Sequence, residues 1–322
     1  MITVSAPGKL MLFGEHAVVY GYPCLVTAVG QRMKVTVEVL DTQDFFLDAE
    51  DVNIKGYKKQ MMDIGTGEIP KGAQFVEIAV KNFKEKYPMQ TGVRIKTKSE
   101  FSSQFGFGSS SASTVCTIKA LSELTGVNLS DKVLFDLCYK TVLDIQKAGS
   151  GFDVAAAIYG GTIEYIKGGE MIEPLPINEI PLLIGYTGVK ADTTTIIGDV
   201  KRKMDAEPEK VRRIFEAIAK IVEDAKEKIK EADWERVGTL MNFNQEYLRD
   251  LGVSTEKLES MISASKKAGA YGAKLSGAGG GDCMITLTSD DKKRAVADAI
   301  AKAGGQVIDV SVNTEGVRVE SI

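Results

Sequence analysis

Apolar and polar residues alternate along two long segments near the N-terminus, 2–13 and 23–39, in runs such as "ITVS", "LMLF" and "MKVTVEVL". An alternation with a period of two is typical of strands that bury one face. The same pattern returns in "GVRIKTKS" at 92–99. These segments predict an antiparallel or mixed sheet in the N-terminal part of the chain.

Other segments carry apolar residues three and four positions apart, which places them on one face of an α-helix. One of them, "GAQFVEIAVKNFKEKY", ends in lysines, as a helix C-terminus favours. We expect Ser254 to cap the helix that has Glu256 in its first turn. The predicted helices span 72–87, 111–126, 130–146, 152–158, 255–268 and 289–303, with a long helical region at about 191–250.

The kind of predicted element changes after "IKGGE" at 166–170, because strands are concentrated before this segment and helices after it. Further strands are expected in "LLIGYTG", after a glycine run near residue 280, and near 306–312. A length of 322 residues suits two domains at roughly 100–200 residues each. The sequence therefore predicts an α+β protein with one domain over 1–167 and a second over 168–322.

Charge and hydropathy limit the possible partners. The net charge is −4 and the isoelectric point about 5.4, so no overall basic field attracts nucleic acid or an anionic membrane. No apolar run approaches the roughly 18 residues of a membrane span. The start, "MITVSAPGKLMLFGEH", lacks the basic and apolar regions of a signal peptide, so a cytoplasmic location is expected. A small anionic substrate would have to be bound by local groups.

The scarcity of histidine and the spacing of cysteine exclude several kinds of site. His16 is the only histidine, which rules out metal sites that need two. The cysteines, Cys24, Cys116, Cys138 and Cys283, form no C-x-x-C pair, so we expect buried free thiols. No G-x-S-x-G segment occurs, which argues against a Ser-His-Asp hydrolase.

Glycine is dense in three segments, "APGKLMLFGEHAVVYG" at 6–21, "QFGFGSSSAS" at 104–113 and "KLSGAGGGDC" at 274–283. A glycine run costs conformational entropy, and chains tolerate it where the backbone approaches a ligand closely. The second segment matches neither the G-x-x-x-x-G-K-[ST] loop nor a Rossmann fingerprint. It places N–H groups and serine hydroxyls at the N-terminus of a predicted helix. This arrangement predicts a binding site for a polyphosphate and its metal ion.

The three segments resemble the motifs of the GHMP kinases, the family named for galactokinase, homoserine kinase, mevalonate kinase and phosphomevalonate kinase. "PGKLMLFGEHAVVYG" is similar to the first motif in its mevalonate kinase form, "GFGSSSA" to the phosphate loop, and "KLSGAGGGDC" to the C-terminal glycine motif. They follow the family's order over nearly the whole chain. The resemblance implies an N-terminal ribosomal-S5-like domain, a C-terminal ferredoxin-like domain with added helices, and ATP and substrate in the cleft between them.

The resemblance also assigns roles to residues. Asp153, in "GSGFDVAAA", matches the catalytic aspartate that accepts or orients the proton of the substrate hydroxyl. Lys9 matches the lysine that pairs with this aspartate and with the transferring phosphate. The expected ATP-binding residues are Gly106, Gly108, Ser109, Ser110, Ser111 and Ala112. The expected substrate-binding residues are Glu15, His16, Thr187, Thr193, Gly277, Ala278 and Gly279.

Two features depart from the mevalonate kinase pattern. Ser110 matches the Mg²⁺-binding serine, but Val142 stands where a glutamate usually supplies a second ligand, and Asp144 is the carboxylate nearest to it in the sequence. We therefore assign the metal to Ser110 and Asp144. The segment around Asp153 is closer to that of phosphomevalonate kinases, so the motifs point to two different substrates.

Charge decides between these substrates. A 5-phosphate adds up to two negative charges and needs extra cations, ideally arginines. The substrate-side segments offer only His16 and Lys190. The expected activity is ATP- and Mg²⁺-dependent phosphorylation of mevalonate by a homodimer, with phosphomevalonate kinase as the alternative. A diphosphomevalonate-decarboxylase-type lyase and a catalytically inactive ligand-binding protein are more distant alternatives.

Overall fold

A computed structural model of the protein describes residues 1–102 and 104–320. Its first sheet has the strand order β12-β1-β2-β5-β3-β4, with β6 and β7 attached through β2. The pairing of β3 with β5 is parallel and the other pairings are antiparallel, so the sheet is mixed, as predicted. Its strands are β1 (Ile2–Phe13), β2 (Cys24–Leu40), β3 (Asp44–Ala49), β4 (Ile54–Gln60), β5 (Gly92–Ser99), β6 (Thr162–Ile166), β7 (Met171–Pro174) and β12 (Arg318–Val319).

The hairpin of β3 and β4 was not among the predicted elements. Strand β4 reads "IKGYKKQ", and its residues are half-buried or exposed. It forms an edge of the sheet, and lysines on an edge strand discourage pairing with other chains. Because such a strand buries little apolar surface, the pattern of hydrophobic residues gives only a weak signal for it.

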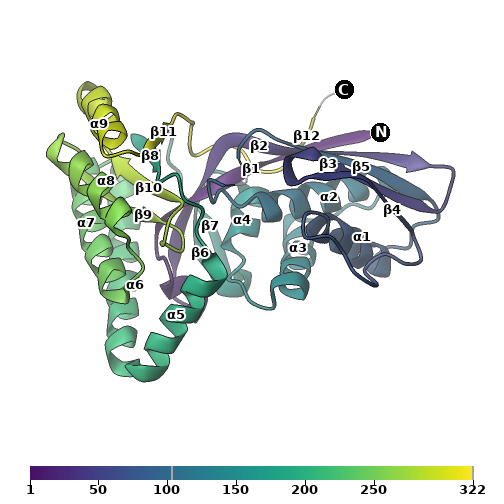
Figure 1. Ribbon diagram of the computed structural model, residues 1–322, viewed down its shortest axis with the longest axis horizontal. Helices are drawn as coiled ribbons and strands as arrows, with labels where there is room; N and C mark the ends of the chain where they lie inside the picture. The colour runs from purple at the N-terminus through teal and green to yellow at the C-terminus, as the bar shows by residue number, and fades with distance from the viewer. Residues whose placement is uncertain (103, 321–322) are drawn as a thin grey trace.

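Four helices cover one face of this sheet, and Figure 1 shows them together on that side. Helix α2 packs directly on β1 and β2, with buried residues on most of its surface. This packing fixes the N-terminus of α2 relative to β1. The four are α1 (Gln74–Lys86), α2 (Ser109–Thr125), α3 (Asp131–Gln146) and α4 (Phe152–Tyr159), and the short 3₁₀ helices are η1 (Ala17–Tyr20), η2 (Glu50–Val52) and η3 (Lys167–Gly169).

The second sheet has the order β11-β8-β10-β9 and is antiparallel throughout. Together with its helices it is a β-α-β-β-α-β unit of ferredoxin-like type, in which four helices stand where the simplest version has one. Helices lie over this sheet in Figure 1. The strands are β8 (Leu182–Tyr186), β9 (Gly272–Ser276), β10 (Cys283–Leu287) and β11 (Gln306–Ile308); the helices are α5 (Thr193–Ala206), α6 (Pro208–Lys230), α7 (Trp234–Leu251), α8 (Glu256–Lys267) and α9 (Asp290–Lys302).

The long helical region expected at about 191–250 is present as three successive helices, because Pro208 starts α6 and Asp233 caps α7 by accepting from the Arg236 N–H. One local prediction nearby needs correction. Helix α8 is capped by Thr255, whose hydroxyl accepts from the Leu258 N–H, and not by Ser254. The Ser254 hydroxyl instead donates to the Glu259 carboxylate. Two adjacent residues that both cap well cannot be ranked from sequence alone.

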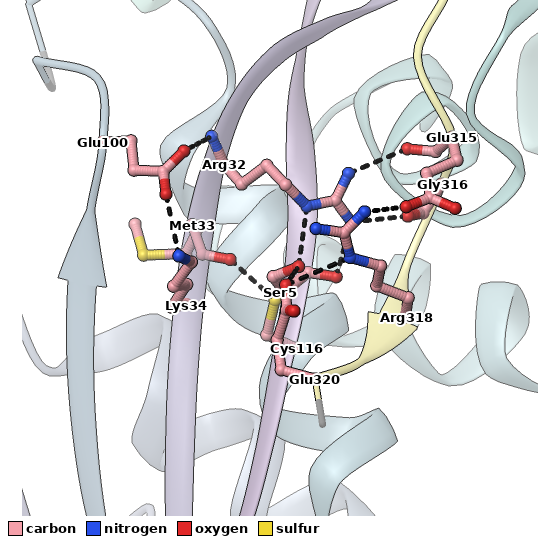
Figure 2. A network of polar contacts seen from close by, with 10 residues as sticks. All are labelled: Ser5, Arg32, Met33, Lys34, Glu100, Cys116, Glu315, Gly316, Arg318 and Glu320. Carbon is pink, nitrogen blue, oxygen red and sulfur yellow. Dashed lines mark hydrogen bonds and ion pairs between the residues drawn. The ribbon is translucent and has the colours of Figure 1, made fainter. Parts of the chain in front are cut away.

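The C-terminal segment crosses back to the first sheet, where β12 pairs with β1 (Figure 1). The guanidinium of Arg32 holds it there, as Figure 2 shows. It donates to the carbonyl oxygens of Glu315 at 3.0 Å and Gly316 at 2.6 Å, and to the Ser5 hydroxyl at 2.6 Å. Strand β7 also belongs to this sheet, so the first sheet draws strands from both sides of residue 167.

The four cysteines are buried and free, as predicted. Burial raises the pKa of each of their thiols. None of the helices in the described ranges has the length and apolar character needed to cross a membrane.

Candidate active site

Lys9 lies in β1 beside the loop that precedes α2. The register of β1 shifts between Pro7 and Gly8, and the Lys9 N–H donates to the Phe107 carbonyl oxygen at 3.0 Å. A Cβ on Gly8 would come within 3.0 Å of Phe107, so only glycine allows this close approach. The Lys9 ammonium donates to the Gly106 carbonyl oxygen at 2.9 Å. Strand β1 therefore holds Lys9 and also contacts the loop that precedes α2.

Asp153 is in the first turn of α4, which follows a left-handed Gly151 with φ of 91°. A Cβ on Gly151 would approach the Tyr165 hydroxyl to 2.6 Å, so glycine fixes the entry of this helix. Asp153 Oδ1 lies 3.2 Å from Lys9 Nζ. This oxygen is buried without an aligned hydrogen bond, so the contact is an ion pair that leaves the oxygen able to accept a proton.

The glycine before α2 lies against this pair. A Cβ on Gly108 would be 3.2 Å from Lys9 Cε and 3.7 Å from Asp153 Cβ. Gly106 and Gly108 both have positive φ, at 71° and 79°, which disfavours any other residue. The three segments that supply Lys9, Gly108 and Asp153 are far apart in the sequence, and here they converge.

The first turn of α2 presents unused donors. The cap Gly108 has no side chain, and Ala112 is the first residue of the helix whose N–H is bonded, to the Gly108 carbonyl. Within the described ranges the hydroxyls of Ser109, Ser110 and Ser111 make no hydrogen bond. Those of Ser113 and Thr114, one turn on, both donate to the Ser110 carbonyl at 2.9 Å. Free N–H groups and hydroxyls at a helix N-terminus suit a phosphate.

Glu15 and Lys274 form an ion pair between the two sheets, with both side chains fully buried. Burial raises the pKa of Glu15 and lowers the pKa of Lys274, and their mutual attraction opposes both shifts. The second carboxylate oxygen of Glu15 has no hydrogen-bond partner in the described part of the chain. The pair joins the end of β1 to β9.

His16 follows at a positive φ of 61°. Its Nε2 lies 2.9 Å from the Ala278 carbonyl oxygen. Burial lowers the pKa of His16, so the ring is neutral and Nε2–H is the donor. The residue ties the first glycine segment to the third.

The glycines at 277–281 have different reasons for being small. A Cβ on Gly277 would meet no atom within 4 Å, so this residue faces open space. A Cβ on Gly279 would lie 2.2 Å from the Val253 carbonyl oxygen, and one on Gly281 would lie 2.6 Å from that of Val189. Gly277 fits the predicted approach of a ligand. Gly279 and Gly281 are required by the packing of the chain.

The two predicted substrate threonines lie in different settings. Thr187 is buried, and its hydroxyl donates to the Val189 carbonyl oxygen at 3.1 Å. Thr193 is exposed at the start of α5. The loop between them is held by Asp282, whose Oδ1 accepts from the Ala191 N–H at 2.9 Å.

Residues 74–161 match the model of the GHMP kinases N terminal domain, and residues 221–306 match that of the GHMP kinases C terminal domain. The mevalonate kinase of Pyrococcus furiosus is 36% identical, over 100% of this chain and 99% of its own. That of Pyrococcus abyssi is 37% identical, over 100% and 98%. The chain belongs to the mevalonate kinase family.

The crystal structure of the Methanococcus jannaschii mevalonate kinase has the same fold, with a TM-score of 0.83 at 28% identity and coverage of 97% of this chain and 98% of that one. The Streptococcus pneumoniae phosphomevalonate kinase, solved with phosphomevalonate and AMPPNP, shares the fold at 18% identity, with a TM-score of 0.79 and coverage of 97% and 100%. The expected two-domain GHMP kinase fold is confirmed.

The carboxylate of Asp144 is engaged away from Ser110. It accepts from Lys140 Nζ at 2.5 Å and from Asn82 Nδ2 at 2.9 Å, on the faces of α3 and α1. Val142 is buried and apolar. Neither residue shares a described hydrogen bond with the phosphate loop, so the metal role assigned to Asp144 stays a prediction.

Two further residues belong to the site and were not singled out from the sequence. Lys274 could have been noticed as a charged residue within an otherwise apolar strand, because a buried lysine needs a partner. Asp282 could have been noticed as a lone carboxylate after five small residues. Only the fold reveals that it faces the phosphate loop, since a Cβ on Gly106 would lie 2.5 Å from its Oδ2.

Proposed function

We propose that the chain transfers the γ-phosphoryl group of ATP to the primary alcohol of mevalonate, giving 5-phosphomevalonate. The observation that carries the proposal is the Lys9–Asp153 ion pair packed against Gly108 at the N-terminus of α2. It brings a proton acceptor, a cation and a phosphate-binding helix terminus to one point. Phosphoryl transfer depends on positioning and countercharge more than on a strong nucleophile.

In this arrangement the Asp153 carboxylate accepts the proton of the alcohol as its oxygen attacks the γ-phosphorus. Lys9 lies beside this carboxylate and neutralises charge on the transferring group. Ser109, Ser110 and Ser111 offer N–H groups and hydroxyls to the phosphates. A nearby Mg²⁺ would supply charge neutralisation of the β- and γ-phosphates, and the free hydroxyl of Ser110 fits such an ion.

On the substrate side, we propose that Glu15, His16 and the open face at Gly277 border mevalonate. His16 is neutral and its Nε2–H is already used, so it offers Nδ1 as an acceptor for a hydroxyl. Thr187 is committed to its own turn, so we propose that it shapes the loop rather than donating to substrate. Thr193 stands at the exposed start of α5, where it could meet substrate only if the loop closes.

Phosphomevalonate kinase activity is the second candidate, and the segment around Asp153 favours it. The pairing of the available cations argues against this activity. Lys9 pairs with Asp153 and Lys274 pairs with Glu15, while Lys190 is exposed. A second phosphate would therefore find few free cations among the described residues of the site.

The test is product formation. Mevalonate, 5-phosphomevalonate, homoserine and galactose are each incubated with ATP and Mg²⁺, and ADP and the phosphorylated product are measured by ³¹P NMR. The proposal expects stoichiometric 5-phosphomevalonate and ADP from mevalonate. Turnover of homoserine or galactose with none of mevalonate would reject it. Sedimentation of the same sample checks the predicted homodimer, and fractionation of the source cells checks the predicted cytoplasmic location.

A further inference from the structure

Asp282 places a carboxylate beside the phosphate loop, where a triphosphate would be repelled by it. Its Oδ2 would be 2.5 Å from a Cβ on Gly106. Gly106 is also the residue whose carbonyl oxygen accepts from Lys9 Nζ at 2.9 Å. The carboxylate thus reaches the same stretch of loop as the catalytic lysine, from the opposite sheet.

The position of Asp282 is fixed by its backbone. Its φ is 52°, a conformation that non-glycine residues rarely adopt. Its N–H donates to the Val189 carbonyl oxygen at 2.8 Å, its own carbonyl oxygen accepts from the Thr187 N–H at 2.9 Å, and Oδ1 accepts from the Ala191 N–H at 2.9 Å. These bonds occupy Oδ1 and leave Oδ2 directed at the loop.

The charge of this carboxylate is poorly compensated in the structure. Burial raises the pKa of Asp282, and Lys9 and Lys190 oppose that shift only in part. No ion pair within 4.0 Å involves Asp282 among the described residues. An uncompensated carboxylate next to bound phosphates is unfavourable unless a cation lies between them.

The other carboxylates do not meet this need. Val142 has no carboxylate. The carboxylate of Asp144 accepts hydrogen bonds from Lys140 and Asn82, and that of Asp153 is paired with Lys9. We infer that Asp282 would supply the carboxylate ligand of the nucleotide-bound Mg²⁺, alongside the Ser110 hydroxyl. This inference rests on the proposed function, since it concerns the metal that accompanies ATP.

The test uses Asp282→Asn, which keeps an oxygen for the Ala191 N–H and removes the charge. The first measurement is Mn²⁺ affinity in the presence of AMPPNP, by electron paramagnetic resonance of the full chain. The second is the affinity for AMPPNP in excess chelator, by calorimetry. We expect Mn²⁺ affinity to fall at least about fivefold, because a charged ligand is lost. We expect metal-free AMPPNP to bind equally well or more tightly, because repulsion is removed.

A metal ligand and a structural residue differ in how Asp282→Asn changes the two affinities. Only the loss of a metal ligand lowers Mn²⁺ affinity without lowering the affinity for metal-free AMPPNP. If Asp282 only braces the 187–191 loop, both affinities fall together, and the inference is wrong. Unchanged Mn²⁺ affinity also overturns it, as does a loss confined to Asp144→Asn, the rival carboxylate. Asp192→Asn is the matched control, because it removes a nearby exposed carboxylate and keeps a good helix cap, and it should leave Mn²⁺ affinity unchanged. A wild-type chain that binds no AMPPNP would contradict the proposed function itself.

Discussion

Asp153 is the residue on which the proposed chemistry depends most directly. Asp153→Asn keeps the shape of the side chain and removes the acceptor for the alcohol proton. We expect kcat with mevalonate to fall about 10²- to 10⁴-fold, the usual contribution of a general base. ATP affinity should change little, because the phosphate contacts come from α2. Steady-state kinetics and nucleotide calorimetry on the same variant give both numbers, and near-normal turnover would remove Asp153 from the mechanism.

His16 gives the stability of the protein a pH dependence that can be isolated. Burial lowers the pKa of His16 below the ordinary value for histidine, about 6.5. As pH falls through about 6.5, the unfolded chain binds a proton that the folded chain does not, so the free energy of unfolding decreases. The free energy that His16 contributes to stability is fully present above the pKa of His16 in the unfolded chain and is lost as the pH falls below that value.

The comparison is with His16→Gln, which can still donate to the Ala278 carbonyl. Urea unfolding at several pH values should show the wild type losing stability relative to the variant below about pH 6.5. Because His16 is the only histidine, the difference between the two curves reports this residue. A difference that does not vary with pH would mean that the pKa of His16 is the same in the folded and unfolded chains.

For single residues, the sequence indicated which residues belong to the site better than it indicated which residues they contact. Lys9, Gly108 and Asp153 were expected to act together, and the fold brings them into contact. The partners of Glu15 and Asp144 were not predictable, because Lys274 and Asn82 are distant in the sequence. Contacts of that kind depend on how the elements pack, which no local pattern records.

Between elements, the buried pair of Glu15 and Lys274 joins β1 to β9. Removing one partner of a buried ion pair leaves the other charge uncompensated and costs about 3–5 kcal/mol. We therefore expect Glu15→Gln and Lys274→Met each to destabilise the protein by about that amount. The double variant should be less destabilised than the sum of the two, because it buries no charge.

A double-mutant cycle by chemical denaturation measures this coupling. Losses that simply add would show that the two side chains act independently and that the pair does not bind the sheets together. Lys292→Met serves as a control, because the side chains of Lys292 and its neighbour Asp291 are largely exposed and such a pair contributes little.

The elements themselves were predicted unevenly. Helices with a clear apolar face, such as α1, α3 and α8, lie close to their expected bounds. The β3–β4 hairpin was missed because an exposed edge strand has little apolar alternation. Strand β12 has two residues and depends on the bonds that Arg32 makes to the returning chain (Figure 2), so the sequence carries no local signal for it.

Over the whole molecule, contacts between the three glycine-rich segments join the two sheets. The Phe105 ring packs on Tyr186 of β8 with centroids 5.1 Å apart, and Lys9 in β1 bonds to the next residue, Gly106. The phosphate loop thus touches both sheets. We therefore expect nucleotide binding at this loop to depend on how the two sheets are placed.

We propose that this site takes a substrate with a single carboxylate and a free primary alcohol. The deciding measurement is kcat/KM for mevalonate and for 5-phosphomevalonate at matched ATP and Mg²⁺. Because the cations of the site are already paired, we predict that mevalonate is preferred at least about tenfold, a difference of ~1.4 kcal/mol in transition-state binding. A higher kcat/KM for 5-phosphomevalonate would contradict the account.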